Sequence, residues 1–187
     1  MPAAEAAAAA APEAAAAPEA PAALALLRVL AALGAPGLRA AAGQAAARVS
    51  ARGVADRPWA ATLGFPRTGD CWHYADVGGR QESLTMTFCY GDQQHAISVL
   101  IDHGRGGKIG DAWVAKGAGL RAETEQAAHE NPLVVFEMIA VADAGRRLAR
   151  AVAAGECPEQ ADQVDDVVAH RALVHARLAL LLSAGTR

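Results

Sequence analysis

The sequence predicts an α+β domain in which an antiparallel meander sheet of three to four strands packs against two or three C-terminal helices. From Cys71 onward, apolar and polar residues alternate as they do in half-buried strands, and turn residues separate the alternating segments. Beyond about residue 120 the apolar spacing becomes helical. All eight aromatic residues lie in the range from Trp59 to Phe136, which places the folded core there and beyond.

The chain before the sheet divides into two segments. Residues 1–21 repeat Ala, Pro and Glu, and we predict a disordered low-complexity arm because such a segment cannot offset its own ordering entropy. Residues 22–53 are an Ala-rich helical segment, and the stretch ALALLRVLAAL predicts an amphipathic helix that ends at Gly34 and packs on the domain or on a partner. A cleaved targeting segment is the alternative. Residues 54–187 then form a single α+β domain.

The stretch YGDQQH, residues 90–95, predicts a hairpin with a four-residue loop and with Tyr90 opposite His95. This register collects the large apolar side chains of both strands on one face: Leu84, Met86 and Phe88 opposite Ile101, Val99 and Ile97.

The preceding stretch, CWHYADVGGR, joins the same sheet through a three-residue turn, Gly78-Gly79-Arg80, which sets Trp72 and Tyr74 beside Met86 and Leu84. The opposite face is then polar but almost uncharged, so we expect something small, or the N-terminal helix, to cover it. Its predicted members are Cys71, His73, Ser83, Thr85, Thr87, Cys89, Ser98 and Asp102.

After a fourth strand, DAWVA, the pattern predicts three helices. The first runs from Leu120 to Glu130. The second runs from Pro132 to about Ala153, with Asn131 as its N-cap. The last begins at about Pro158 or Asp162 and ends at Ser183.

The stretch LIDHGRGGKIGDAW, residues 100–113, is the strongest candidate for chemistry. Asp102 and His103 are the candidate catalytic residues, although neighbouring strand residues point to opposite faces. Alternatively, Asp102 accepts backbone N–H groups of the glycine turn. Successive glycine N–H groups flanked by cations also suit an anion-binding nest. The candidate ligand-binding residues are Arg105, Gly106, Gly107, Lys108, Asp111 and His73.

Cys71 and His73 share one strand face and form part of a metal site only if Cys89 or Asp102 completes it. We predict no metal and no cofactor, with Cys71 as a packing residue and His73 bonded to a neighbouring threonine. Three cysteines without paired spacing indicate a reducing, cytoplasmic setting.

A formal net charge of −3 argues against general nucleic-acid binding, and no apolar stretch is long enough to span a membrane. A homodimer through the alanine-rich helices is compatible with their small side chains. The alanine-rich and arginine-rich composition resembles that of high-GC actinobacteria. The run from Trp72 to Val114 is similar to uncharacterised actinobacterial proteins in which a strand ending in Ile-Asp-His leads into a glycine-rich turn, and this resemblance implies no activity.

The absence of a complete catalytic set favours a non-enzymatic binding or protein-interaction module with an unknown protein partner. The alternative is an enzyme or ligand-binding protein for a small anionic molecule, which uses the glycine-rich turn from Asp102 to Asp111. An enzyme requires these groups to line one concave pocket, whereas a module requires an exposed apolar surface.

Overall fold

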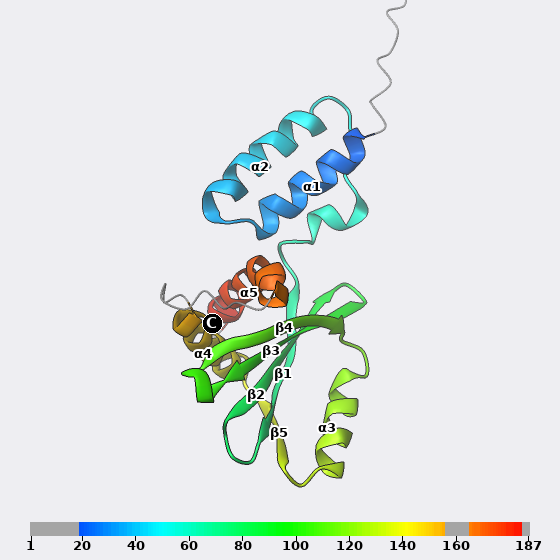
Figure 1. The fold of residues 1–187 in the computed structure, drawn as a ribbon. Helices are drawn as coiled ribbons and strands as arrows, with labels where there is room; N and C mark the ends of the chain where they lie inside the picture. Colours follow the sequence, from blue (N-terminus) through cyan, green and yellow to red (C-terminus); the bar gives the residue numbers. More distant parts are fainter. Residues whose placement is uncertain (1–18, 156–164, 185–187) are drawn as a thin grey trace, which may run out of the picture.

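The computed structural model describes residues 19–155 and 165–184 of the chain. Most of the predicted arm, residues 1–21, lies outside this part, and so do Cys157 and both predicted starts of the last helix, Pro158 and Asp162. Within the described residues the chain forms an antiparallel sheet with helices on both sides, which confirms the predicted α+β class (Figure 1).

Five strands of the described chain form one antiparallel sheet in the order β4-β3-β2-β1-β5. The first four form the predicted meander, in which each strand pairs with the next along the chain. The fifth strand, which was not predicted, pairs with β1 at the other edge. The bounds are β1 (Arg67–Asp76), β2 (Gln81–Tyr90), β3 (Gln93–Asp102), β4 (Lys108–Lys116) and β5 (Val134–Ile139).

Helices lie on both faces of the sheet (Figure 1). α4 (Val141–Gly155) and α5 (Asp165–Ala184) cover one face, which we call the core face. α3 (Leu120–Glu130) lies against the opposite face, which we call the α3 face, and contacts β1 and β5. The main core consists of Cys71, Leu84, Met86, Phe88, Ile97, Val99, Ile101 and Ala112 from the sheet and Ala144, Leu148, Ala151, Val174 and Leu181 from α4 and α5.

Two further helices, α1 (Ala20–Leu33) and α2 (Pro36–Ser50), form a hairpin beyond α5 (Figure 1). The predicted helix end is confirmed, because α1 stops immediately before Gly34. α1 packs mainly on α2, and it contacts α5 more sparsely. None of the helices in the described ranges has an apolar stretch of the length that a lipid bilayer requires.

The structure corrects the helix predicted from Pro132 to about Ala153. Residues Val134–Ile139 form β5 instead, and α4 begins only after them. Asn131 is not the N-cap of a helix: it is the C-cap of α3, and its Oδ1 accepts from the N–H of Leu133 in the turn that leads into β5. The run LVVFEMI suits a strand, since β-branched and aromatic side chains pack well on a pleated surface, but its continuous apolarity fits a buried helix equally well.

The β2–β3 hairpin is tighter than predicted. Tyr90 pairs with Gln93 rather than with His95, so the loop consists of Gly91 and Asp92 alone. Gly91 has φ +60°, the left-handed region that the first central position of a type II′ turn requires. Because the register differs from the predicted one by two residues, the predicted apolar side chains still share one face.

The β1–β2 hairpin overturns the predicted faces of β1. Its loop, residues 77–80, is one residue longer than predicted, and the Asp76 carboxylate accepts from the backbone N–H groups of Arg80 and Gln81. A register difference of one residue moves each side chain to the other face. The two aromatic side chains therefore lie on the α3 face, and the cysteine and histidine lie on the core face. The reversed residues are Cys71, Trp72, His73 and Tyr74.

Candidate functional site

The glycine-rich turn after β3 satisfies three of its backbone N–H groups internally. Asp102 Oδ1 accepts from the N–H of Arg105 (3.2 Å), as predicted for an Asx-type turn. The N–H of Gly106 donates to the His103 carbonyl (3.2 Å). The N–H of Gly107 donates to the Asp102 carbonyl (2.9 Å). Because these amides are engaged within the turn, they do not form the anion-binding nest that the glycines suggested.

The two candidate catalytic residues lie on opposite sides of the sheet. Asp102 pairs with Gln81 and belongs to the α3 face. His103 Nε2 lies 3.7 Å from Glu82 Oε1, on the side of α4. The Asp102–His103 dyad is therefore not assembled, because a positioned base and its partner need hydrogen-bond reach.

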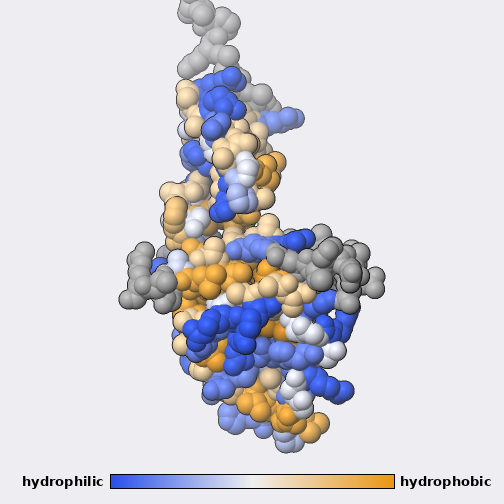
Figure 2. All heavy atoms as spheres, turned by 90° about the vertical axis from the view of Figure 1, so that its left-hand side faces the viewer, coloured by the Kyte–Doolittle hydropathy of each residue, from blue (hydrophilic) through white to orange (hydrophobic). Residues whose placement is uncertain are grey.

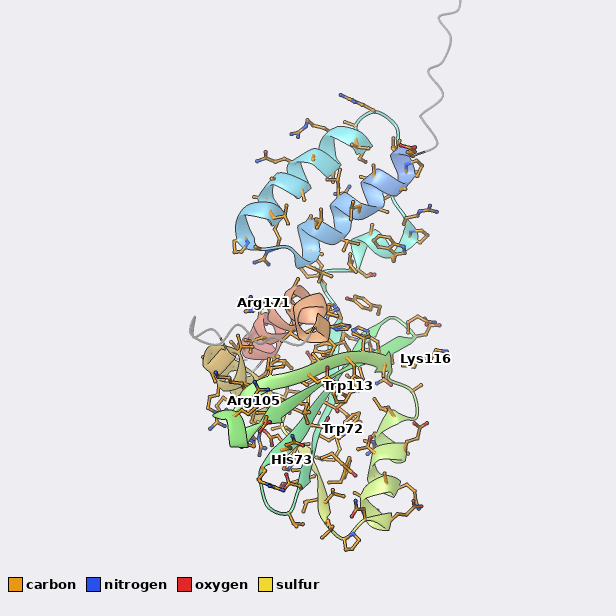
Figure 3. All side chains as sticks on the ribbon, in the orientation of Figure 1. Trp72, His73, Arg105, Trp113, Lys116 and Arg171 are labelled. Carbon is orange, nitrogen blue, oxygen red and sulfur yellow. The ribbon has the colours of Figure 1, made fainter. Side chains whose placement is uncertain are left out.

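Of the two lysines, only Lys108 adjoins the turn. Lys108 and Lys116 are the two ends of β4, and Arg105 lies at the end away from Lys116 (Figure 3). Asp111 Oδ1 accepts from the N–H of its neighbour Ala112 (2.7 Å), beside an irregularity of the β3–β4 register.

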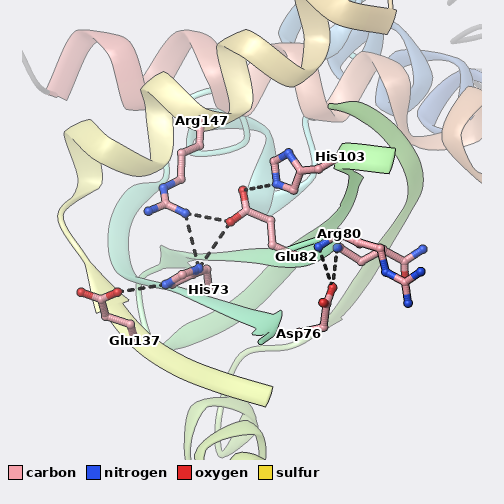
Figure 4. A network of polar contacts seen from close by, with 8 residues as sticks. His73, Asp76, Arg80, Glu82, His103, Glu137 and Arg147 are labelled. Atoms are coloured by element: carbon pink, nitrogen blue, oxygen red, sulfur yellow. Dashed lines mark hydrogen bonds and ion pairs between the residues drawn. The ribbon is translucent and has the colours of Figure 1, made fainter. Parts of the chain in front are cut away.

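A polar network lies on the core face beneath α4 (Figure 4). Glu82 is only 7% exposed, and its Oε2 accepts from Arg147 NH1 of α4 at 2.7 Å. His73 Nδ1 lies 3.3 Å from the same oxygen, and His103 approaches the other carboxylate oxygen. A buried carboxylate is stable only with such partners, so this network ties α4 to β1 and β2.

His73 also links the network to the edge of the sheet. Its Nε2 lies 3.1 Å from Glu137 Oε2 on β5, and Arg147 NH1 lies 3.4 Å from its Nδ1. The predicted bond from His73 to a threonine is thus replaced by contacts with two carboxylates and an arginine.

Cys71 and His73 do share a face, but the other two ligands considered, Cys89 and Asp102, lie on the α3 face. Burial, with a smaller contribution from the charge of Asp70, raises the pKa of the Cys71 thiol to about 12. Across the described residues, no group of three or more His, Cys, Asp or Glu side chains is placed to hold a metal ion.

A pocket of about 340 Å³ adjoins the network beside the glycine turn. Glu82 pairs with Arg147 within this pocket, and Arg150 and His103 also line it. Its lining residues are Glu82, Ile101, His103, Gly106, Gly107, Arg147, Arg150, Ala151 and Ala154.

A larger cavity of about 600 Å³, which we call the α3 groove, lies between the α3 face and α3. Its floor carries short hydroxyl side chains, its walls are apolar and aromatic, and polar groups complete the lining. The floor residues are Ser83, Thr85 and Ser98; the wall residues are Tyr74, Leu100, Trp113, Leu120, Ala127 and Val134; the remaining lining residues are Asp76, Gln81, Glu123 and Thr124.

The groove exists because the facing surfaces do not fill the space between them. Thr85 and Ser98 are buried and hydrogen-bond each other (Oγ1–Oγ 2.7 Å), so their hydroxyls are satisfied without a long side chain. α3 contributes no buried residue. The predicted cover over the small polar face is therefore α3, not the N-terminal helix, and it covers this face only in part.

The ionisable side chains that line the groove are mainly acidic. The pKa of Asp76 lies below its ordinary value because its carboxylate accepts backbone hydrogen bonds, first from Gln81 and then from Arg80 and Gly78. Glu123 lies in the first turn of α3, and its carboxylate has no hydrogen-bond or ion-pair partner within the described part of the chain. None of the described residues that line the groove is Lys, Arg or His.

Comparison with protein-family models, with curated proteins and with solved structures gave no match for this chain. The geometry of the α3 groove and of the network therefore carries the functional inference.

Sequence reasoning does not identify the groove, although two of its signals are present. The small polar strand face and the helix from Leu120 to Glu130 are both predicted, but their juxtaposition depends on the chain path. Reversal of β1 brings Tyr74 to this face, and Trp113 of β4 joins it. The network members Glu82 and Arg147 lie 65 positions apart, and no local pattern connects them.

Proposed function

We propose that this protein is a non-enzymatic binding module that holds a small amphipathic molecule in the α3 groove. The volume of the groove, about 600 Å³, carries the proposal, because it falls within the roughly 300–1,000 Å³ of small-molecule sites. Such sites combine apolar and aromatic walls with a few polar groups that orient the ligand. Trp113 and Tyr74 supply the aromatic walls, and the floor hydroxyls supply the polar groups.

The packing of α3 supports the same function. Leu120, Thr124 and Ala128 are only partly buried, and no residue of α3 is fully buried. A helix normally gains most of its stability from an apolar face packed on the rest of the protein. A ligand in the groove would supply the contacts that α3 lacks, so binding and ordering of α3 are expected to be coupled.

A binding module that uses a flat apolar patch is less well supported. On the side of the molecule where α4 lies, a hydrophobic band is directly bordered by a broad hydrophilic band that crosses the body (Figure 2). An enzymatic role for the glycine turn also lacks support, since Asp102 and His103 lie on opposite sides of the sheet.

Blocking the groove tests the proposal. Ala127→Trp places an indole in the groove, whereas Ala122→Trp adds the same side chain at an exposed position of α3 outside the lining. The uncharged fluorescent probe N-phenyl-1-naphthylamine is titrated into each protein. We expect Ala127→Trp to weaken probe binding by about tenfold or more, which corresponds to roughly 1.4 kcal/mol, and Ala122→Trp to leave it within about twofold.

Two results would contradict the proposal. One is the absence of any probe binding to the unmodified protein at concentrations up to about 1 mM, the weak limit of ordinary affinities. The other is equal binding to both tryptophan variants, which would place the probe outside the groove. Circular dichroism of both variants checks that α3 remains helical.

A further inference from the structure

We infer that the ligand of the α3 groove is a cation: an organic amine whose apolar body lies along the walls and whose ammonium group meets the acidic side of the lining. This inference rests on the proposed function and adds the charge of the ligand to it. It is drawn from the charges, the hydrogen-bonding groups and the aromatic rings that face the cavity.

The charges that face the cavity are those of Asp76 and Glu123. Asp76 engages the backbone of its own hairpin loop through Oδ2, and the nearby Arg80 offsets part of its charge. The carboxylate of Glu123 has neither an ion-pair partner nor a hydrogen-bond partner among the described residues. It therefore supplies an unneutralised carboxylate next to an apolar cavity, and a ligand cation would be complementary to it.

The uncharged groups point to the same ligand. An ammonium group donates up to three hydrogen bonds and accepts none, so it needs acceptors. Thr124 Oγ1 donates its proton to the Leu120 carbonyl, which leaves the lone pairs of this oxygen to accept from a ligand. The ring faces of Trp113 and Tyr74 also attract cations.

An anionic ligand would make none of these favourable contacts with the carboxylates, the acceptor oxygen and the aromatic rings. Its carboxylate or phosphate would lose water without gaining a cation, because no Lys, Arg or His is found among the described lining residues. It would also lie near the carboxylates of Asp76 and Glu123. The inferred ligand thus has the opposite charge to the one that the glycine-rich turn suggests from sequence.

A series of ligands that differ only in the head group tests the inference. Octylammonium, octanol and octanoate are titrated calorimetrically at neutral pH and low salt, where partly exposed charges are least screened. We expect octylammonium to bind roughly fivefold to tenfold more tightly than octanol, and octanoate to bind more weakly than octanol. Raising the salt concentration should narrow these differences.

A matched pair of substitutions assigns the preference. Glu123→Gln removes the groove carboxylate and should bring octylammonium to within about twofold of octanol. Glu130→Gln removes the same charge from the last turn of α3, outside the groove, and should leave the preference unchanged. The binding of octanol is the internal control for the fold of each variant.

The outcomes separate the two proposals. If octanol binds and octylammonium binds no more tightly, or if Glu123→Gln leaves the preference intact, the inferred ligand charge is wrong while the binding function stands. If none of the three compounds binds, the proposed function itself fails. If Glu130→Gln abolishes the preference as fully as Glu123→Gln does, the preference reflects overall charge, and the inference is overturned.

Discussion

Removal of the Arg147 guanidinium is expected to destabilise the domain, because Glu82 would then keep a buried charge without its closest cation. In Arg147→Met the apolar stem of the side chain is preserved, while the 2.7 Å contact with Glu82 Oε2 is lost. The side chain of Glu82 is 9% exposed, and that of Arg147 is 31% exposed. The pair is thus largely but not fully withdrawn from water.

The expected magnitude follows from this burial. Breaking a fully buried ion pair costs about 3–5 kcal/mol. Arg147 retains some contact with water, and two histidines remain within 3.3 and 3.7 Å of the Glu82 carboxylate. We therefore expect a loss of about 2–3 kcal/mol in the free energy of unfolding, or roughly 5–10 °C in Tm for a domain of this size.

Urea denaturation followed by tryptophan fluorescence measures this loss, and Arg146→Met is the matched control. Arg146 is on the same helix and pairs with Asp143, but both side chains are exposed, so its removal should cost less than about 0.5 kcal/mol. The double variant Glu82→Gln/Arg147→Met should recover about 1 kcal/mol or more relative to Arg147→Met, since no unpaired charge remains.

The reasoning would be refuted by equal stabilities of the Arg146 and Arg147 variants. It would also be refuted by a double variant that is as unstable as Arg147→Met alone. Either result would mean that the Glu82 charge is not the source of the loss.

Two further predictions concern single side chains. Burial, and then the charge of Arg177, lowers the pKa of His95 below its ordinary value of 6.5, so below that pH the unfolded chain binds a proton that the folded chain does not. The free energy of unfolding should therefore fall as the pH drops from about 6.5 towards the pKa of His95 in the folded protein. Urea denaturation should show a smaller fall for His95→Phe. Identical pH profiles for the two proteins would contradict this assignment. Cys71 should resist iodoacetamide at about pH 8 in the folded protein and react in urea, as peptide mass spectrometry can show, because its thiol is buried and its pKa is about 12. Equal labelling in both states would contradict that burial.

The parts of the fold that local chemistry determines are predictable from the sequence. The helix Leu120–Glu130 has the predicted bounds, and the Asp102 side chain accepts from the turn backbone as expected. The apolar side chains of β2 and β3 share a face despite the register error, because a difference of two residues preserves the alternation.

The errors arise where two local solutions have similar merit. A four-residue loop and a two-residue type II′ turn both fit YGDQQH, and the positive φ of Gly91 goes with the shorter one. For the β1–β2 loop, the Asp76 carboxylate stabilises an extra residue that the glycines alone do not indicate. This one additional loop residue shifts the β1–β2 register, so that His73 lies in the network on the core face and Tyr74 lies in the α3 groove.

The site depends on long-range placement, which a single sequence specifies only weakly. Glu123 and Thr124 reach the groove because α3 folds back over β1 and β5 after the meander ends. β5 itself is ambiguous in sequence, since its apolar run lacks a period that distinguishes a strand from a buried helix. Without β5 in place, the position of α3 does not follow from the pattern.

The most direct test of the α3 groove as the binding site is the measurement of intermolecular NOEs between octanol and the isotope-labelled protein. The methylene protons of octanol should show NOEs to the Trp113 indole, the Leu120 methyls and the Thr124 methyl, which line one cavity from two elements. NOEs confined to exposed apolar side chains elsewhere, such as Leu26 or Phe65, would contradict the groove as the site.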